Sequence, residues 1–325
     1  MSRHKKIPVW LFSGLSALAI LIRIALVYRQ NIFVQPLDWT GSWYLIPFSI
    51  VLMAFSLSLA AWVWSDLMIA LGSNIPFTTH LRYYLITQLS RRIPGKVWFL
   101  AGRGYLYQQE GESLRTVAVA SGIEWAISGL SGGLVSLIAA NYALNYITNG
   151  QRIILGLTLL AALLLIQPRT ILWLTRLIKL EDAPKVSYGN LCKWLGVYGL
   201  LWVAGAVIFY FIANVVTDVP IVYFPHILSS WSLIGAVSIL IIFIPTNLGL
   251  SEIGLGFLLA QIMPASIGIV VAVLAYVLFL LYEIIAITVI LVNLSPTKIL
   301  GRVSHIGNWL SKDQMTIKVS RLDDL

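Results

Sequence analysis

Long apolar runs dominate this 325-residue sequence. A helix needs about 20 mostly apolar residues to cross the hydrocarbon layer of a bilayer, and six runs reach roughly that length. Only 11% of the residues are charged, whereas a soluble domain has about a quarter, so the chain has too little polar surface to coat an aqueous core. We therefore predict an all-α integral membrane protein. The six predicted spans are 8–28, 44–71, 117–140, 152–174, 191–213 and 267–292.

Two further apolar stretches are interrupted by proline and glycine. Proline removes a backbone donor and clashes with the preceding turn, and glycine is a poor helix former, so each interruption should end a helix. We predict two broken helices that each return to their own side of the membrane. A seventh span is the alternative, because residues 227–244 are nearly long enough to cross. The interrupted stretches are 78–108, with Pro94 and Gly95, and 227–263, with Pro245 and Gly249.

The basic residues indicate the orientation. With the N-terminus inside, the six spans leave 19 of the 22 lysines and arginines in four inside segments, as the positive-inside rule requires. We therefore expect a multi-pass protein of the cell membrane with both termini in the cytoplasm. Residues 1–295 would form the transmembrane domain. Residues 296–325 would form a cytoplasmic tail, either with an amphipathic surface helix at 298–311 or simply basic.

The orientation also predicts two halves of opposite topology. Spans 44–71 and 117–140 flank the first broken helix, and spans 191–213 and 267–292 flank the second. Interrupted helices at corresponding places in inverted halves are typical of transporter binding sites.

Four basic residues follow or flank the first break: Arg91, Arg92, Lys96 and Arg103. Basic side chains beside a broken helix can bind an anionic headgroup, and the free amides of the second half-helix add positive potential. The alternative is that these residues are ordinary inside charges that contact surface lipid.

Two acidic residues complete the candidate site. Glu124 lies within a predicted span, where an ionisable group is costly and usually faces a partner or water; Arg91, Arg92 and Arg103 are its natural partners. A structural ion pair and a transport role are both open. Glu252 begins the second half of the later broken helix, where it could cap free amides or couple to a proton or headgroup.

The sequence contains no recognisable catalytic or metal-binding motif. The single cysteine, Cys192, excludes an internal disulfide and a cysteine metal cluster, and the four histidines are scattered. We therefore expect no cofactor, no metal and no enzymatic activity. The net charge of +9 sits between apolar runs, which favours membrane topology over nucleic-acid binding.

Three features occur in order along the sequence: the segment from Gln88 to Arg103, then Glu124, then the segment from Ile244 to Glu252. Over roughly residues 10–295, they resemble the transmembrane-region family of lysylphosphatidylglycerol synthases. This resemblance implies re-entrant helices that meet near mid-membrane and a role in moving or handling lipids. The soluble aminoacyl-transferase domain of fused family members is not expected here, and neither is lipid aminoacylation.

The sequence departs from the family pattern at the second break and in the last span. Thr246 and Asn247 replace a glycine pair, and Ser251 stands where a basic residue often precedes the acid. Glu283 lies in the final span, where the family frequently has an arginine.

Our leading hypothesis is a flippase-like protein that translocates or handles a phospholipid or an isoprenoid-linked lipid. Membrane lipids would be its partners. One alternative is a proton-coupled secondary transporter of a small solute. The other is a non-transporting membrane partner of a glycosyltransferase or lipid synthase. The predicted substrate-binding residues are Arg91, Arg92, Lys96, Arg103, Glu124 and Glu252.

Overall fold

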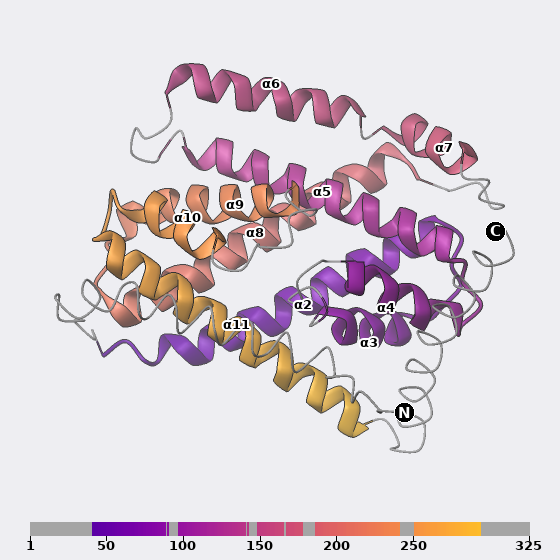
Figure 1. Ribbon diagram of the computed structural model, residues 1–325, viewed down its shortest axis with the longest axis horizontal. Helices are drawn as coiled ribbons and strands as arrows, with labels where there is room; N and C mark the ends of the chain where they lie inside the picture. The colour runs from indigo at the N-terminus through magenta and orange to yellow at the C-terminus, as the bar shows by residue number, and fades with distance from the viewer. Residues whose placement is uncertain are drawn as a thin grey trace, which may run out of the picture. The chain divides into compact units, whose positions relative to one another are not determined.

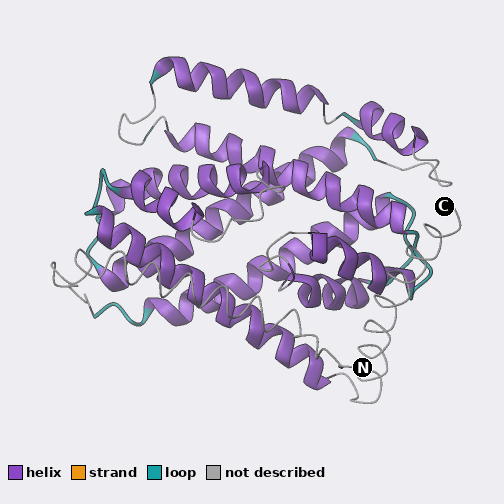
Figure 2. Ribbon diagram, viewed as in Figure 1, coloured by secondary structure: helices purple, strands orange, loops and turns teal. Residues whose placement is uncertain are grey.

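Every regular element that the computed structural model describes is a helix (Figures 1 and 2). The described residues are 41–88, 90, 97–140, 142, 148–165, 167–177, 186–240 and 250–293. The helices are α2 (Leu45–Ala70), α3 (Phe77–Gln88), α4 (Val97–Gln108), α5 (Leu114–Ala140), α6 (Asn149–Leu165), α7 (Pro168–Leu177), α8 (Tyr188–Val216), the 3-10 turn η2 (Ile221–Tyr223), α9 (Phe224–Leu240), α10 (Leu250–Leu259) and α11 (Ala265–Asn293).

Five helical segments are long and apolar enough to cross a membrane. They are α2, α5, α8, the joined η2–α9 segment Ile221–Ile239, and Ala265–Val289 of α11. Large apolar side chains such as Val51 and Phe55 of α2 are more than 60% exposed, which suits lipid better than water. The all-α class and the multi-pass membrane character are thus confirmed. The predicted spans at 44–71, 117–140, 191–213 and 267–292 each correspond to one of these helices.

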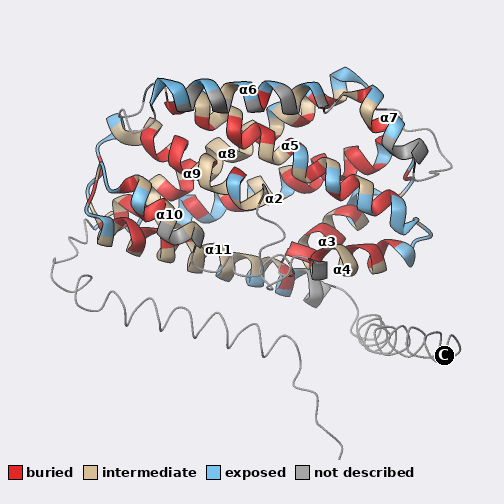
Figure 3. Cartoon of the chain, turned by 45° about the horizontal axis from the view of Figure 1, so that its top comes forward, coloured by how far each residue is buried: buried red, intermediate tan, exposed pale blue. Residues whose placement is uncertain are grey.

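The predicted span at 152–174 is divided in two. Helix α6 has 17 residues, and a new helix, α7, starts at Pro168. Proline fits the first turn of a helix, where its missing N–H is not needed, so it begins α7 rather than continuing α6. Large apolar side chains on α6, such as Ile153 and Leu157, are exposed (Figure 3). The predicted span at 8–28 and the tail helix at 298–311 lie outside the described residues.

The two interrupted stretches form pairs of antiparallel helices. In the first pair, His80 near the start of α3 contacts Tyr107 near the end of α4. In the second pair, His226 near the start of α9 contacts the Leu258 carbonyl near the end of α10. Neither α3 nor α4, at 12 residues each, is longer than about 18 Å, so neither could cross a bilayer alone. The η2–α9 segment is long enough to cross, which favours the alternative we left open for 227–263.

Small residues bring the central spans close together. Helix α5 packs on α8 and on α9, and α2 packs on α8. At the α5–α9 contact, the Ser136 hydroxyl donates to the Ser229 carbonyl at 3.0 Å. Small residues allow helix backbones to approach closely in membranes, where apolar lipid tails supply no hydrophobic drive for association.

Contacts divide the chain into two compact units, Met1–Tyr282 and Glu283–Leu325. All residues of the candidate site belong to the first unit. The described part of the second unit is the end of α11, Glu283–Asn293.

Candidate functional site

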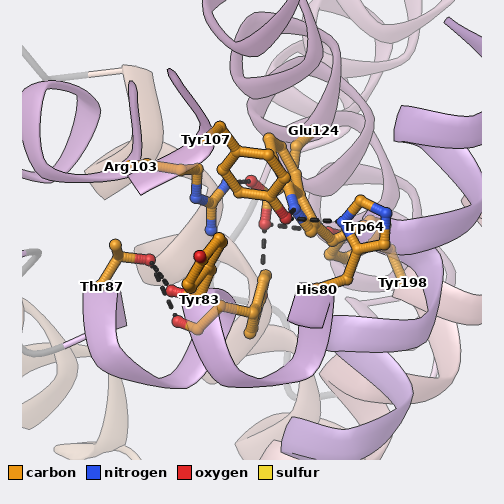
Figure 4. A network of polar contacts seen from close by, with 9 residues as sticks. Trp64, His80, Tyr83, Thr87, Arg103, Tyr107, Glu124 and Tyr198 are labelled. Atoms are coloured by element: carbon orange, nitrogen blue, oxygen red, sulfur yellow. Dashed lines mark hydrogen bonds and ion pairs between the residues drawn. The ribbon is translucent and has the colours of Figure 1, made fainter. Parts of the chain in front are cut away.

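The polar centre of the first unit is a buried ion pair between α4 and α5 (Figure 4). Arg103 Nη1 lies 2.6 Å from Glu124 Oε2, and the two residues are only 0% and 1% exposed. Removing two charges from water costs several kcal/mol per ion, so such a pair persists only with good geometry and further hydrogen bonds. The surroundings of both residues supply them.

Two tyrosines hold the other oxygen of the carboxylate. The hydroxyls of Tyr84 (α3) and Tyr198 (α8) each donate to Glu124 Oε1 at 3.2 Å. Both tyrosines are buried. The carboxylate of α5 therefore joins three other helices, α3, α4 and α8, at one point.

Aromatic rings cover the plane of the Arg103 guanidinium. Its Cζ lies 3.8 Å from the ring centroid of Trp64 (α2) and 4.2 Å from that of Phe99 (α4). The ring of Tyr84 is 5.0 Å away. A cation is attracted to the face of an aromatic ring, most strongly when both are desolvated, so these rings stabilise the charge and fix its orientation.

A second chain of hydrogen bonds holds Trp64 in place. Tyr107 Oη lies 2.6 Å from Trp64 Nε1 and 2.6 Å from His80 Nδ1. Indole nitrogen can only donate, so the tyrosine oxygen accepts from Trp64. Tyr107 thus links Trp64 of α2 to His80 of α3 through one oxygen atom.

Burial keeps both partners of this bond neutral. It lowers the pKa of His80 from 6.5 to about 4, opposed in part by a backbone hydrogen bond with Ile75. It also raises the pKa of Tyr107 well above its usual value, although the hydrogen bond from Trp64 and the charge of Arg103 act in the other direction.

Two carboxylates that follow α4 accept hydrogen bonds at the end of the α3–α4 pair where α3 begins. The Tyr83 hydroxyl donates to Glu110, and the Ser73 hydroxyl donates to Glu112. Nearby, Asp66 at the end of α2 accepts from Trp194 Nε1 and pairs with Lys193 Nζ of α8, each at 2.6 Å. This second ion pair is about one-third exposed, unlike the buried pair of Arg103 and Glu124.

Two donor atoms of Arg103 are left over. Within the part of the chain that the structure describes, Nε and Nη2 of this fully buried side chain have no hydrogen-bond partner. Leaving a buried donor unsatisfied costs about 1–3 kcal/mol, and more for a charged group.

The structure brings two of the predicted site residues together. Glu124 pairs with Arg103, one of the three partners predicted for it. Glu252 is the third residue of α10, so it does begin the second half of the later broken helix, although its side chain is not described. The other predicted residues lie outside the described residues, namely Arg91, Arg92, Pro94, Gly95, Lys96, Pro245 and Gly249.

The sequence interpretation missed the aromatic part of this site. Tryptophan and tyrosine are expected at membrane interfaces, so no site was assigned to them. The sequence spacing could have indicated part of this site, because His80 and Tyr84 are four residues apart, as are Arg103 and Tyr107. Each pair therefore lies on one helical face.

No group of three or more histidine, cysteine or acidic residues in the described segments could hold a metal ion. No protein family model matches the chain, and a search of curated proteins finds no significant relative. The resemblance described above therefore stays a prediction.

Proposed function

We propose that this protein translocates a lipid or similar amphiphile across the cell membrane. The observation that carries the proposal is the buried pair of Arg103 and Glu124, set where a hairpin too short to cross meets three spanning helices. An ionisable group at membrane depth is expensive and is a functional-site hypothesis by default. A purely structural contact between these helices could be made by apolar side chains at lower cost.

The helix directions support the proposal. We infer that α3–α4 enters the membrane from the cytoplasm and returns, and that α9 crosses while α10 turns back. Helices α2 and α5 then flank the first helix pair, and α8 and α11 flank the second. The α3–α4 and α9–α10 pairs are both antiparallel around a break, and interrupted helices at corresponding places in inverted halves are typical of transporter sites.

The remaining predicted residues would work at the same breaks. Arg91, Arg92 and Lys96 follow the end of α3 closely in sequence, and Arg103 is on α4. We propose that they attract the headgroup and that Glu124 and Glu252 balance their charge. The resemblance to the lipid-handling family agrees with this assignment.

The test is lipid exchange in liposomes that contain the purified protein. Fluorescent phospholipid in the inner leaflet should become accessible to an external quencher faster than in empty liposomes. Glu124→Gln removes the charge that holds Arg103 and should slow exchange strongly. Asp66→Asn is the matched control, because it also breaks an ion pair to a basic residue but at a partly exposed position; it should exchange near the wild-type rate.

Other outcomes would favour the alternatives. Exchange no faster than in empty liposomes contradicts the proposal. Solute flux that depends on a pH gradient would instead indicate a proton-coupled transporter. Co-purification of a lipid-modifying enzyme without any flux would indicate a non-transporting partner.

A further inference from the structure

The free atoms of Arg103 form a specific binding edge. A guanidinium offers five N–H groups in one plane, and Glu124 takes a bond from Nη1 only. The N–H groups of Nε and Nη2 point in the same direction, side by side, and these are the two atoms without a partner in the described residues. Such a pair matches two oxygens of one phosphate or carboxylate group.

The neighbours of Arg103 leave only this edge for a ligand. The rings of Trp64 and Phe99 lie against the guanidinium plane at 3.8 and 4.2 Å, so an acceptor cannot approach through the face. Glu124 accepts from the remaining nitrogen, Nη1, and Tyr84 and Tyr198 hold Glu124. The donors are therefore oriented before any ligand arrives, which lowers the entropy lost on binding.

We propose that the Nε–Nη2 edge of Arg103 binds one phosphate group of the substrate through two parallel hydrogen bonds. This inference rests on the proposed function and names the chemistry that the site recognises. Arg103 already balances the charge of Glu124, so a singly charged phosphodiester suits the site better than a doubly charged phosphomonoester.

Access to the edge requires movement of the α3–α4 hairpin, because Arg103 is 0% exposed. Contacts that cross between the hairpin and its neighbours hold it closed, among them the bond from Trp64 to Tyr107. The structure thus corresponds to a closed state, and the phosphate enters when α4 separates from α2 and α5.

Binding can be measured by native mass spectrometry in a sugar detergent that contains no phosphate. The probes are phosphatidylglycerol, diacylglycerol with the same acyl chains, and inorganic phosphate. Wild-type protein should retain phosphatidylglycerol and not diacylglycerol. Displacement of the lipid by millimolar inorganic phosphate would identify free phosphate as a sufficient ligand, whereas no displacement would show that the site needs the lipid phosphodiester.

The decisive variant is Arg103→Lys, which keeps the positive charge but loses the parallel donors. We expect its affinity for phosphatidylglycerol to fall at least tenfold. Arg82→Lys is the matched control, since Arg82 lies on the same hairpin but is exposed; its affinity should not change. Unchanged affinity in folded Arg103→Lys overturns the inference.

If Arg103→Lys fails to fold, the wild-type protein still tests the inference. Equal retention of diacylglycerol and phosphatidylglycerol by the wild-type protein would also overturn it. The lipid exchange assay on the same preparation separates the two proposals. Exchange without Arg103-dependent binding would contradict the phosphate-binding edge but support the proposed function. Arg103-dependent binding without exchange would support the phosphate-binding edge but contradict the proposed function.

Discussion

At the residue scale, the pair of Arg103 and Glu124 connects five helices. It links α4 to α5 directly, and through Tyr84, Tyr198 and Trp64 it also contacts α3, α8 and α2. Replacing both members of a buried ion pair by apolar residues is often neutral or stabilising, whereas removing one member costs about 3–5 kcal/mol. Stability alone therefore does not account for the pair.

His80 should make the stability of the protein depend on pH. It lies on α3, outside the spanning helices, and burial lowers its pKa to about 4. The unfolded chain, with a histidine pKa near 6.5, binds more protons than the folded protein between these two values. Stability is therefore complete above pH 6.5 and should fall as the pH drops towards 4, by up to about 3 kcal/mol. Thermal unfolding of the detergent-solubilised protein across this range measures the loss.

The control for this prediction is His80→Gln. Its side-chain amide can still donate a hydrogen bond to Tyr107 or accept one from it, but it does not titrate. Glu110 and Glu112 lie nearby and are the same in both proteins, so they affect both unfolding curves equally. The difference between the two unfolding curves isolates His80. Parallel curves for the two proteins would mean that His80 is not neutral in the folded state.

Sequence patterns identified the charged residues of the site but not their aromatic surroundings. Glu124 and Arg103 could be named because charges are rare in apolar segments. Trp64 and Tyr198 could not, since tryptophan and tyrosine have the same composition signal at an interface and in a buried site. Which of three arginines pairs with Glu124 depends on how α4 packs on α5, and no local pattern contains that information.

At the element scale, the contact of α5, α8 and α9 depends on the absence of side chains at two glycines. A Cβ on Gly235 (α9) would lie 2.2 Å from ring atoms of Trp202 (α8), and one on Gly132 (α5) would lie 2.8 Å from the same ring. The indole cannot move easily, because its Nε1 donates to the Ser128 carbonyl at 2.9 Å. The ring thus fills the space that both glycines leave.

Gly235→Ala should therefore destabilise the protein. The rigid ring must shift or the helices must separate, and overpacking of this kind costs about 1–3 kcal/mol. Gly122→Ala on α5 is the control, because its Cβ would meet nothing within 4 Å and alanine is the better helix former. Thermal unfolding should show a lower midpoint for Gly235→Ala only. Equal midpoints would mean that Trp202 is free to move.

Helix type and most helix positions followed from the length of the apolar runs, whereas some helix ends did not. The breaks were expected from proline and glycine, and α3 and α4 do end and begin on either side of residues 89–96. Pro168 was overlooked, although polar Gln167 and Arg169 flank it, and its ring begins a new helix there. The three-residue turn η2, which extends α9 to spanning length, has no sequence signature of its own.

At the scale of the first unit, contacts assign the loops to two ends. Ser73 bonds to Glu112, and Asp66 bonds to Trp194, so the segments after α2, after α4 and before α8 share one end. At the other end, Ser136 bonds to Ser229, which brings the end of α5 near the start of α9. Helix α6 runs antiparallel to α5, since Gly133 faces Leu159 and Leu137 faces Gly156. This arrangement agrees with the predicted parity.

Cysteine labelling in intact cells decides the orientation. Cys192 is exposed, so Cys192→Ser provides the background, and single cysteines are added at Asn149, Asp218 and Gln109, all of which are exposed. The positive-inside rule places the first two outside and Gln109 in the cytoplasm. A membrane-impermeant maleimide should therefore label Asn149→Cys and Asp218→Cys at once, and Gln109→Cys only after permeabilisation, which also proves that this site can react.

Labelling of Gln109→Cys in intact cells would reverse the orientation. Labelling of only one of the other two would contradict the shared end itself, because the antiparallel packing of α6 on α5 and the Ser136–Ser229 bond require Asn149 and Asp218 to emerge together.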